Sequence, residues 1–241
     1  MSGDHTLLLL HGLGATGRVW DGWRAKLDER RPGRWAAPDL PGHGSADRLG
    51  EYTFESMAAG IAADLDHGAS YVIVGHSLGG VVGLALASGE HGVQVETVIG
   101  LGIKVVWTDA ELAKARSLAE RPVSWFDSRD EAAERYLRVA GLTGLVEPDD
   151  ESIDAGLVEA DGRWRLAMDP STFAVGAPDM PALLKAAQAD VVLARGEHDP
   201  MNTDSQLAAL HNQVVTLGRL GHNAHVEDPA AVLRLVTGHM R

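Results

Sequence analysis

Short apolar runs alternate with segments of helical periodicity along most of this chain. Such runs, bounded by glycine or polar residues, predict buried strands, and they lie at residues 7–10, 35–38, 72–74, 97–106, 190–195 and 214–217. Between them apolar residues recur at helical spacing, as at Met57, Ile61 and Leu65 after a capping Thr53. The alternation predicts an α/β fold, with a mostly parallel sheet of about six strands flanked by helices.

The alternation breaks between residues 107 and 174, which are rich in polar residues and contain no convincing strand. Helices are predicted there at residues 110–120, 130–139 and 151–159. A helical insertion between two strands predicts a cap over the active edge of a core formed by residues 1–106 and 175–241. The alternative is a structural excursion that merely covers the sheet.

Aromatic and thioether side chains are concentrated in this predicted cap. Small ligands are usually buried against such side chains, so these residues are candidates for a substrate pocket, although many of them are equally expected to form the core of the cap. The candidates are Trp107, Trp125, Phe126, Trp164, Met168 and Phe173, together with His76 from the predicted core.

Charge and composition exclude several classes of function. The net charge is −13 and no basic stripe is present, which argues against nucleic acid or an anionic membrane as a partner. The absence of cysteine excludes disulfides, thiolate metal sites and a cysteine nucleophile. No apolar run approaches the ~20 residues of a membrane span, and no signal peptide is recognised. A cytoplasmic protein is expected, and its oligomeric state stays open.

One candidate nucleophile lies where a buried strand meets a buried helix. The segment Gly75-His-Ser-Leu-Gly79 matches G-x-S-x-G, a tight turn that exposes a serine hydroxyl above the edge of the sheet. Taken alone the match is weak, because 28 glycines make such a pattern easy to find by chance. Ser77 therefore needs support from the rest of the chain.

A base and an acid for Ser77 should come from loops after other strands, since ligands of an open parallel sheet bind beyond the carboxyl ends of its strands. Asp199 follows the strand at 190–195, and His222 follows the strand at 214–217. The chain order Ser, Asp, His is that of α/β-hydrolases. Competing candidates remain open at this point, and they are Glu197 and Asp109 for the acid and His225 for the base.

Four motifs in the expected order give the chain a family resemblance. They are His11-Gly-Leu-Gly14, Asp39-Leu-Pro-Gly-His-Gly-Ser45, Gly75-His-Ser-Leu-Gly79, and Gly221-His222 followed by Glu227-Asp-Pro229. The chain resembles serine esterases of the α/β-hydrolase fold over nearly its whole length. The resemblance implies an oxyanion hole made by the backbone amides of Leu13 and Leu78. Because the family often opens with an antiparallel hairpin and the first strand here starts near the N-terminus, a trimmed sheet is expected.

Other uses of the same residues are not supported by spacing. The histidines show no metal-ligand pattern, and the glycine-rich loop lacks both G-K-[ST] and G-x-G-x-x-G, so neither a metal nor a nucleotide cofactor is expected. His11 and His43 are expected to hydrogen-bond loop backbone.

The predicted function is hydrolysis of a small apolar or aromatic carboxylic or carbamate ester through an acyl-enzyme, with a small ester-like molecule as the substrate. The overall layout resembles small actinobacterial esterases, including those that cleave the methyl carbamate carbendazim. Residues 38–44 also resemble the menaquinone-pathway lyase of this fold, whose cap arginines would bind a carboxylated substrate. Further alternatives are a carbon–carbon bond hydrolase and a ligand receptor with little turnover. The cap arginines available are Arg116, Arg121, Arg129 and Arg138.

Overall fold

The computed structural model describes residues 5–30 and 34–239, so residues 1–4, 31–33 and 240–241 of the predicted core lie outside the described residues. Its centre is a six-stranded sheet in the order β2-β1-β3-β4-β7-β8, and neighbouring strands pair in parallel throughout the described part of the sheet. The strands are β1 (His5–Leu10), β2 (Arg34–Ala36), β3 (Ser70–His76), β4 (Gln94–Leu101), β7 (Asp190–Gly196) and β8 (Val214–Leu217). The α/β prediction with six strands is confirmed.

The central strands are apolar on both faces, as expected for parallel strands covered by helices. In β1 the side chains alternate between the two sides, because successive residues of a strand point to opposite faces. Leu7 and Leu9 pack into one hydrophobic cluster, and Leu8 and Leu10 pack into the other. All four are fully buried.

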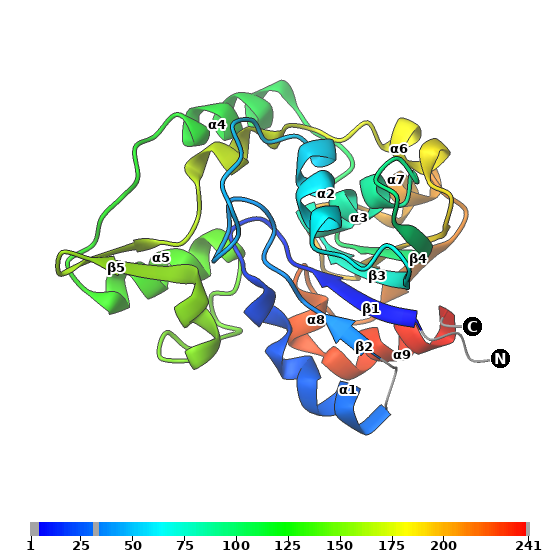
Figure 1. The fold of residues 1–241 in the computed structure, drawn as a ribbon, viewed down its shortest axis with the longest axis horizontal. Coiled ribbons are helices and arrows are strands. Elements are labelled where there is room, and N and C mark those ends of the chain that lie inside the picture. Colours follow the sequence, from blue (N-terminus) through cyan, green and yellow to red (C-terminus); the bar gives the residue numbers. More distant parts are fainter. Residues whose placement is uncertain (1–4, 31–33, 240–241) are drawn as a thin grey trace.

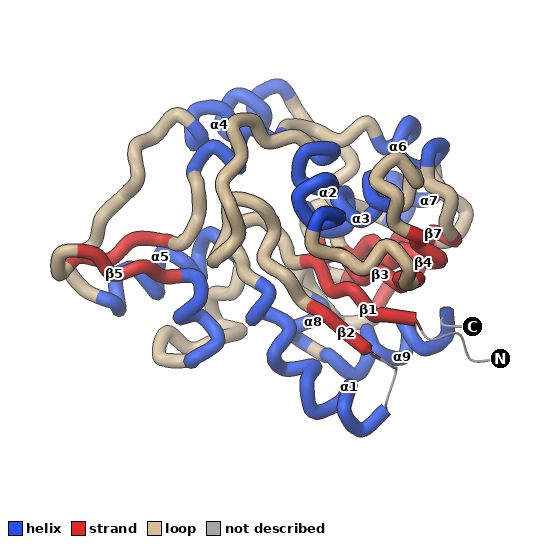
Figure 2. The backbone as a smooth tube through the Cα atoms, viewed as in Figure 1, coloured by secondary structure: helices blue, strands red, loops and turns tan. Residues whose placement is uncertain are grey.

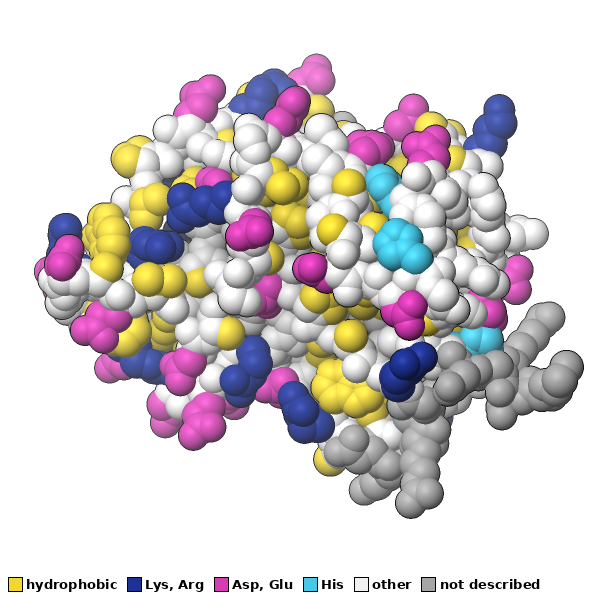
Figure 3. All heavy atoms as spheres, in the orientation of Figure 1, with side chains coloured by type: hydrophobic (Ala, Val, Ile, Leu, Met, Phe, Trp, Pro, Cys, Tyr) yellow, Lys and Arg dark blue, Asp and Glu magenta, His cyan; other side chains and the backbone are white. Residues whose placement is uncertain are grey.

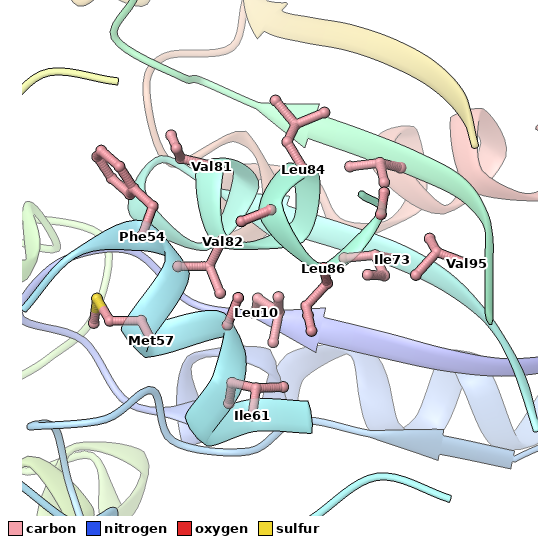
Figure 4. Packing of buried hydrophobic residues seen from close by; sticks show 14 of the residues in the cluster. Leu10, Phe54, Met57, Ile61, Ile73, Val81, Val82, Leu84, Leu86 and Val95 are labelled. Atoms are coloured by element: carbon pink, nitrogen blue, oxygen red, sulfur yellow. The ribbon is translucent and has the colours of Figure 1, made fainter. Parts of the chain in front are cut away.

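Helices cover both faces of the sheet (Figure 1). Side chains of α2 (Phe54–Ala63), α3 (Leu78–Leu86), α6 (Met180–Ala186) and α7 (Asp204–Ala208) belong to the first cluster. The second cluster takes residues of η1 (Gly17–Trp23), α1 (Arg24–Arg30), α8 (Ala224–Glu227) and α9 (Pro229–His239). Figure 4 shows the first cluster, in which Phe54 and Met57 of α2 lie near Val81 and Val82 of α3.

A segment from α4 to η3, here called the insert (residues 109–175), interrupts the sheet between β4 and β7. It contains α4 (Asp109–Ala119), α5 (Arg129–Ala140), η2 (Glu151–Gly156), β5 (Leu157–Ala160), β6 (Arg163–Leu166) and η3 (Pro170–Val175). In Figure 1 the insert lies on the side of the sheet opposite to the chain termini, and long loops lie between it and the sheet (Figure 2). The division into core and cap stays a prediction.

Two predicted elements are corrected. The helix expected at 151–159 is a short 3₁₀ helix followed by the antiparallel hairpin β5–β6. Asp161 and Gly162 at its tip have φ of 53° and 74°, which a two-residue hairpin turn of this hand requires and an Asp-Gly pair supplies. The strand expected at 97–106 ends at Leu101, because Gly102 has a φ of 68° and leaves the extended conformation.

Candidate active site

Ser77 occupies a strained turn between β3 and α3. Its φ of 49° and ψ of −112° are sparsely populated for a residue with a side chain, and such a conformation costs of order 1–3 kcal/mol. The two flanking glycines are sterically required. A Cβ on Gly75 would lie 2.3 Å from the Gly79 oxygen, and one on Gly79 would lie 2.4 Å from the Leu10 oxygen. The turn is held further by a 2.8 Å bond from the Ser77 amide to the Leu101 oxygen.

His222 and Asp199 are joined by a hydrogen bond. The Nδ1 of His222 lies 3.1 Å from each carboxylate oxygen of Asp199, and the Asp199 side chain is fully buried. One oxygen also accepts from the Met201 amide at 2.8 Å. A carboxylate can only accept here, so the ring proton is assigned to Nδ1 and the lone pair is left on Nε2. This is the tautomer that a general base for serine requires.

The competing acid and base candidates are placed elsewhere. Glu197 accepts a hydrogen bond from the Arg219 amide at 2.8 Å, and Asp109 begins α4 in the insert. His225 is buried, and its ring lies against Trp20 and His76 instead of a carboxylate. Of the candidates weighed from the sequence, the structure brings together Asp199 and His222.

The Ser77 hydroxyl has no hydrogen-bond partner among the described residues, so its contact with His222 is not formed in this structure. Catalytic hydrogen bonds are often long or unmade without substrate and tighten in the complex. The two residues are nevertheless linked through His76. The ring centroid of His76, which precedes Ser77, lies 4.6 Å from that of His222 with the planes tilted by 59°, and His76 Nε2 donates to the His222 backbone oxygen at 3.0 Å.

The amides of Leu13 and Leu78 are both without a protein acceptor within the described part of the chain. Both residues line the same small pocket as Ser77. An amide that donates to no protein group can donate to a charge that develops on a bound ligand. The other residues that line the pocket are Phe54, Val81, Lys104, Trp107, Val175, Gly176 and Pro178.

Four buried histidines surround this site and are held neutral. Burial lowers the pKa of His11, His43, His76 and His225, to about 3 for His43 and His225. Nearby imidazoles lower the pKa of all but His11 further. As predicted, His11 and His43 contact loop backbone: the Nδ1 of His11 lies 2.8 Å from the Gly12 oxygen, and its Nε2 accepts from the Leu40 amide.

Comparison with known proteins identifies the family of the chain. A family model described as the alpha/beta hydrolase family matches residues 7–235. The chain belongs to this family. Membership implies a small-molecule substrate. In the described ranges no group of histidine and carboxylate side chains could hold a metal ion, and no helix has the length and apolar character of a membrane span.

Curated relatives of this hydrolase include a lipase and esterases. It is 30% identical to the lipase LipV of Mycobacterium tuberculosis over 69% of the chain and 64% of that lipase. It is 29% identical to the 2-succinyl-6-hydroxy-2,4-cyclohexadiene-1-carboxylate synthase of an Enterobacter species over 94% of the chain and 88% of the synthase. A pimeloyl-[acyl-carrier protein] methyl ester esterase of Neisseria meningitidis is 43% identical, but over only 33% of the chain and 30% of that esterase.

Solved structures share the fold at low identity. An E-2-(acetamidomethylene)succinate hydrolase superposes with a TM-score of 0.79 at 22% identity, covering 99% of this chain and 92% of that one. An esterase of Mycobacterium tuberculosis superposes with a TM-score of 0.71 at 24% identity, covering 97% and 83%. At such identities the likeness establishes the fold alone.

The residues predicted to form the substrate pocket of this hydrolase do not all line one pocket. Trp107 lines the pocket beside Ser77, whereas Phe126, Met168 and Phe173 line a second pocket in the insert. Three further candidates line neither of these pockets, and their assignment to a substrate pocket stays a prediction. Trp125 is 39% exposed beneath two arginines, Trp164 packs against the hydrophobic cluster of the insert, and His76 is buried behind Ser77.

The second pocket also contains two arginines, Arg121 and Arg135. Of the other cap arginines weighed from the sequence, Arg129 pairs with Asp154, Arg138 pairs with Glu134, and Arg116 lies on α4 outside this lining. Arg135 was missed by the sequence analysis, because no sequence pattern distinguishes it from the other arginines of α5. Lys104 was missed as well, although it follows β4 directly and the rule on strand ends could have found it.

A second serine–histidine–carboxylate cluster lies at the opposite edge of the sheet. Ser70 donates to Glu96 at 2.7 Å, and the Nδ1 of His5 lies 3.2 Å from the same carboxylate oxygen. Ser70 and His5 begin β3 and β1, so the cluster is at the amino ends of the strands, where open α/β sheets do not bind ligands. The serine hydroxyl uses its proton in the hydrogen bond to the carboxylate, so this proton does not point to the imidazole, whose Nδ1 lies 3.4 Å from Ser70 Oγ.

Proposed function

We propose that this hydrolase cleaves small carboxylic esters through an acyl-enzyme, with Ser77 as nucleophile, His222 as general base and Asp199 as the orienting acid. The observation that carries the proposal is the hydrogen bond from His222 Nδ1 to the buried Asp199 carboxylate at 3.1 Å. It leaves the lone pair of the imidazole for Ser77 at the carboxyl end of β3.

In the first step Ser77 Oγ forms a bond to the carbonyl carbon and its proton passes to His222 Nε2. The carbonyl oxygen becomes an oxyanion that accepts from the amides of Leu13 and Leu78. Loss of one such donor costs about 10²–10³ in rate in related chemistry. Asp199 stabilises the imidazolium without taking its proton.

The imidazolium then gives its proton to the leaving alkoxide, and the bond between the carbonyl carbon and the alcohol oxygen breaks. Water attacks the acyl-enzyme, His222 takes the water proton, and collapse of the second oxyanion releases the acid and restores Ser77. A carbamate follows the same steps and releases a carbamic acid.

Apolar side chains around Ser77 support a small apolar or aromatic ester as substrate. Phe54, Leu78 and Trp107 line its pocket, and the charge of Lys104 is paired with Glu111 at 2.7 Å. Cleavage of carbamates stays a prediction within this proposal, as none of the relatives named above is described by a carbamate.

A panel of esters, lactones, carbamates and amides tests the proposal. Ser77→Ala should lower kcat by roughly 10⁶ while the protein stays folded, and Ser70→Ala serves as the matched control with unchanged rates. Turnover of p-nitrophenyl acetate with a burst supports the acyl-enzyme. Near-normal rates in Ser77→Ala refute covalent catalysis, and binding without turnover would identify a receptor.

A lyase is the second candidate, favoured by the similarity to the synthase over 94% of the chain. In that reading the same triad abstracts a proton from the substrate, and no acyl group is transferred to Ser77. Trapping of an acyl-enzyme by rapid acid quench and mass spectrometry separates the two, because only the esterase forms it.

A further inference from the structure

The second pocket, lined by residues of the insert, carries positive charge in a strongly acidic protein. Its lining includes Arg121 and Arg135 and no aspartate or glutamate, although the chain has a net charge of −13. Neither guanidinium forms an ion pair with a carboxylate in residues 5–30 and 34–239. Two unpaired cations that line the same pocket repel each other, so this arrangement favours a bound anion.

The rest of the pocket is apolar. Val139, Met168 and Phe173 are among its lining residues. Figure 3 shows the same combination on the surface formed by the insert, where basic side chains lie beside hydrophobic ones. A ligand that satisfies both features has an apolar body and an anionic end.

The pocket is next to the candidate catalytic loops. A Cβ on Gly14, which follows Leu13 by one residue, would lie 2.5 Å from the Val139 side chain. Met168 forms a β-bridge with His43. Trp107 precedes α4 and lines the Ser77 pocket, whereas Leu118 at the other end of α4 lines the arginine pocket. The 11 residues of α4 span about 16 Å, so the two pockets are about one helix length apart.

We propose that Arg121 and Arg135 form an anion subsite for the end of the substrate that is remote from the scissile bond. The inference rests on the proposed esterase activity and names its substrate class: an ester on an extended apolar chain that ends in a carboxylate or a phosphate. Guanidinium groups bind both anions through paired N–H donors.

Matched probes test the subsite. Monomethyl esters of linear dicarboxylic acids carry a carboxylate at the far end, and their ω-amides are neutral analogues of the same length. Methyl esters with an ω-phosphate show whether the subsite prefers phosphate or carboxylate. The wild type should prefer an anionic chain over the amide at least about tenfold in kcat/KM, as expected for one charge-assisted pair. The double variant Arg121→Gln/Arg135→Gln should lose this preference, so that its kcat/KM for the anionic chain falls to that for the neutral amide.

Arg138→Gln is the control, since Arg138 lies one turn further along α5 and is paired with Glu134. It should keep the preference. Calorimetric binding of the free dicarboxylate or the ω-phosphate acid tests the subsite without turnover, and the double variant should bind the preferred anion about tenfold more weakly. Equal binding by wild type and double variant overturns the subsite. A protein that binds the anion in this way but cleaves no ester overturns the proposed function instead.

The loop that carries Asp199 is held by a buried arginine. Arg195, near the end of β7, is buried and donates to the backbone oxygens of Glu197 and Asp199 at 3.1 and 3.0 Å. It also donates to Asn202 at 2.8 Å and to Asp204 at 2.9 Å. The guanidinium of Arg195 therefore donates hydrogen bonds to four residues between positions 197 and 204.

Asn202 extends the network to the strand end beside Ser77. Its side-chain amide donates to the Ile103 oxygen at 2.9 Å, and the Ser77 amide bonds to Leu101 two residues earlier. The geometry points to Arg195 as a positioning residue for Asp199, acting through the loop backbone without touching substrate. This second inference also rests on the proposed role of Asp199.

Arg195→Met should lower kcat at least about tenfold with KM little changed, as expected for loss of charge-assisted hydrogen bonds. Arg195→Lys keeps the charge without the forked donors and should give a smaller loss. Asp204→Asn is the control, because it weakens the outer ion pair and leaves the bonds to the Asp199 loop; it should lower the melting temperature and keep kcat. Wild-type kcat in both Arg195 variants, or an equal loss in Asp204→Asn, overturns the inference. If the proposed role of Asp199 is itself wrong, the Asp199→Asn variant will also keep the kcat of the wild type.

Discussion

His76 Nε2 donates a hydrogen bond to the backbone oxygen of His222 across 3.0 Å. The residue before the candidate nucleophile thus fixes the loop that carries the candidate base. Burial keeps His76 neutral by holding its pKa well below the usual value, and the neighbouring His225 and His222 add to this effect. The neutral ring has a single N–H, and this bond uses it.

His76→Phe keeps a buried ring but removes this donor. We expect kcat to fall about tenfold, because a hydrogen bond of this kind is worth roughly 1 kcal/mol or more, with KM little changed. Steady-state kinetics on an activated ester and a thermal melt measure the two effects. Unchanged kcat in a folded variant would show that the bond does not position His222.

Asp199→Asn should lower kcat by about 10⁴, because the amide favours the wrong tautomer of the base. Glu197→Gln is the matched control, since Glu197 lies two residues away and bonds the Arg219 amide instead of His222. It should keep kcat within a small factor of the wild type. A loss in Glu197→Gln as large as that in Asp199→Asn would reject the assignment of the acid.

Stability should fall as the pH drops below about 6.5. The pKa of His11, His43, His76 and His225 is lowered in the folded protein, to about 3 for His43 and His225. The unfolded chain therefore binds more protons, and each such group loses about 1.4 kcal/mol of stability per pH unit between its unfolded and folded pKa. This contribution is fully present above pH 7. Urea unfolding at pH 7, 6 and 5 measures it.

His225→Leu isolates one of these contributions. Neither ring nitrogen of His225 has a partner in the described part of the chain, so the substitution removes a buried polar group of similar size. The variant should be at least as stable as the wild type at pH 7. It should also lose about 2 kcal/mol less than the wild type between pH 7 and pH 5. A pH dependence identical to that of the wild type would contradict a neutral, buried His225.

The sheet and the turn at Ser77 could be predicted because both depend on short local sequence patterns. The six apolar runs became the six strands, and Gly75 and Gly79 are required because backbone atoms approach within 2.5 Å of where their Cβ would lie. The hairpin at Asp161-Gly162 is also encoded locally, although the sequence pattern of residues 151–159 predicts a helix there. These features depend on neighbouring residues and on the period of the side chains.

The pocket residues could not be separated by sequence. Trp107 and Trp125 are both tryptophans of the same polar segment, but one lies beside Ser77 and the other lies on the surface beneath Arg163 and Arg165. Which aromatic side chain faces a ligand depends on how the insert packs on the loops of the sheet. That packing joins residues that are distant in the chain, and no local pattern records it.

The sequence by itself determined the fold family and the candidate catalytic residues. G-x-S-x-G and the residues that follow two later strands are recognisable because each depends only on a few neighbouring positions. Only the tertiary structure decided that Asp199, and not Glu197 or Asp109, reaches His222, and that Arg121 and Arg135 share one pocket. Carboxylates at neighbouring positions look alike in a sequence. A difference of a few ångströms in where the chain places them decides which one can accept the imidazole proton.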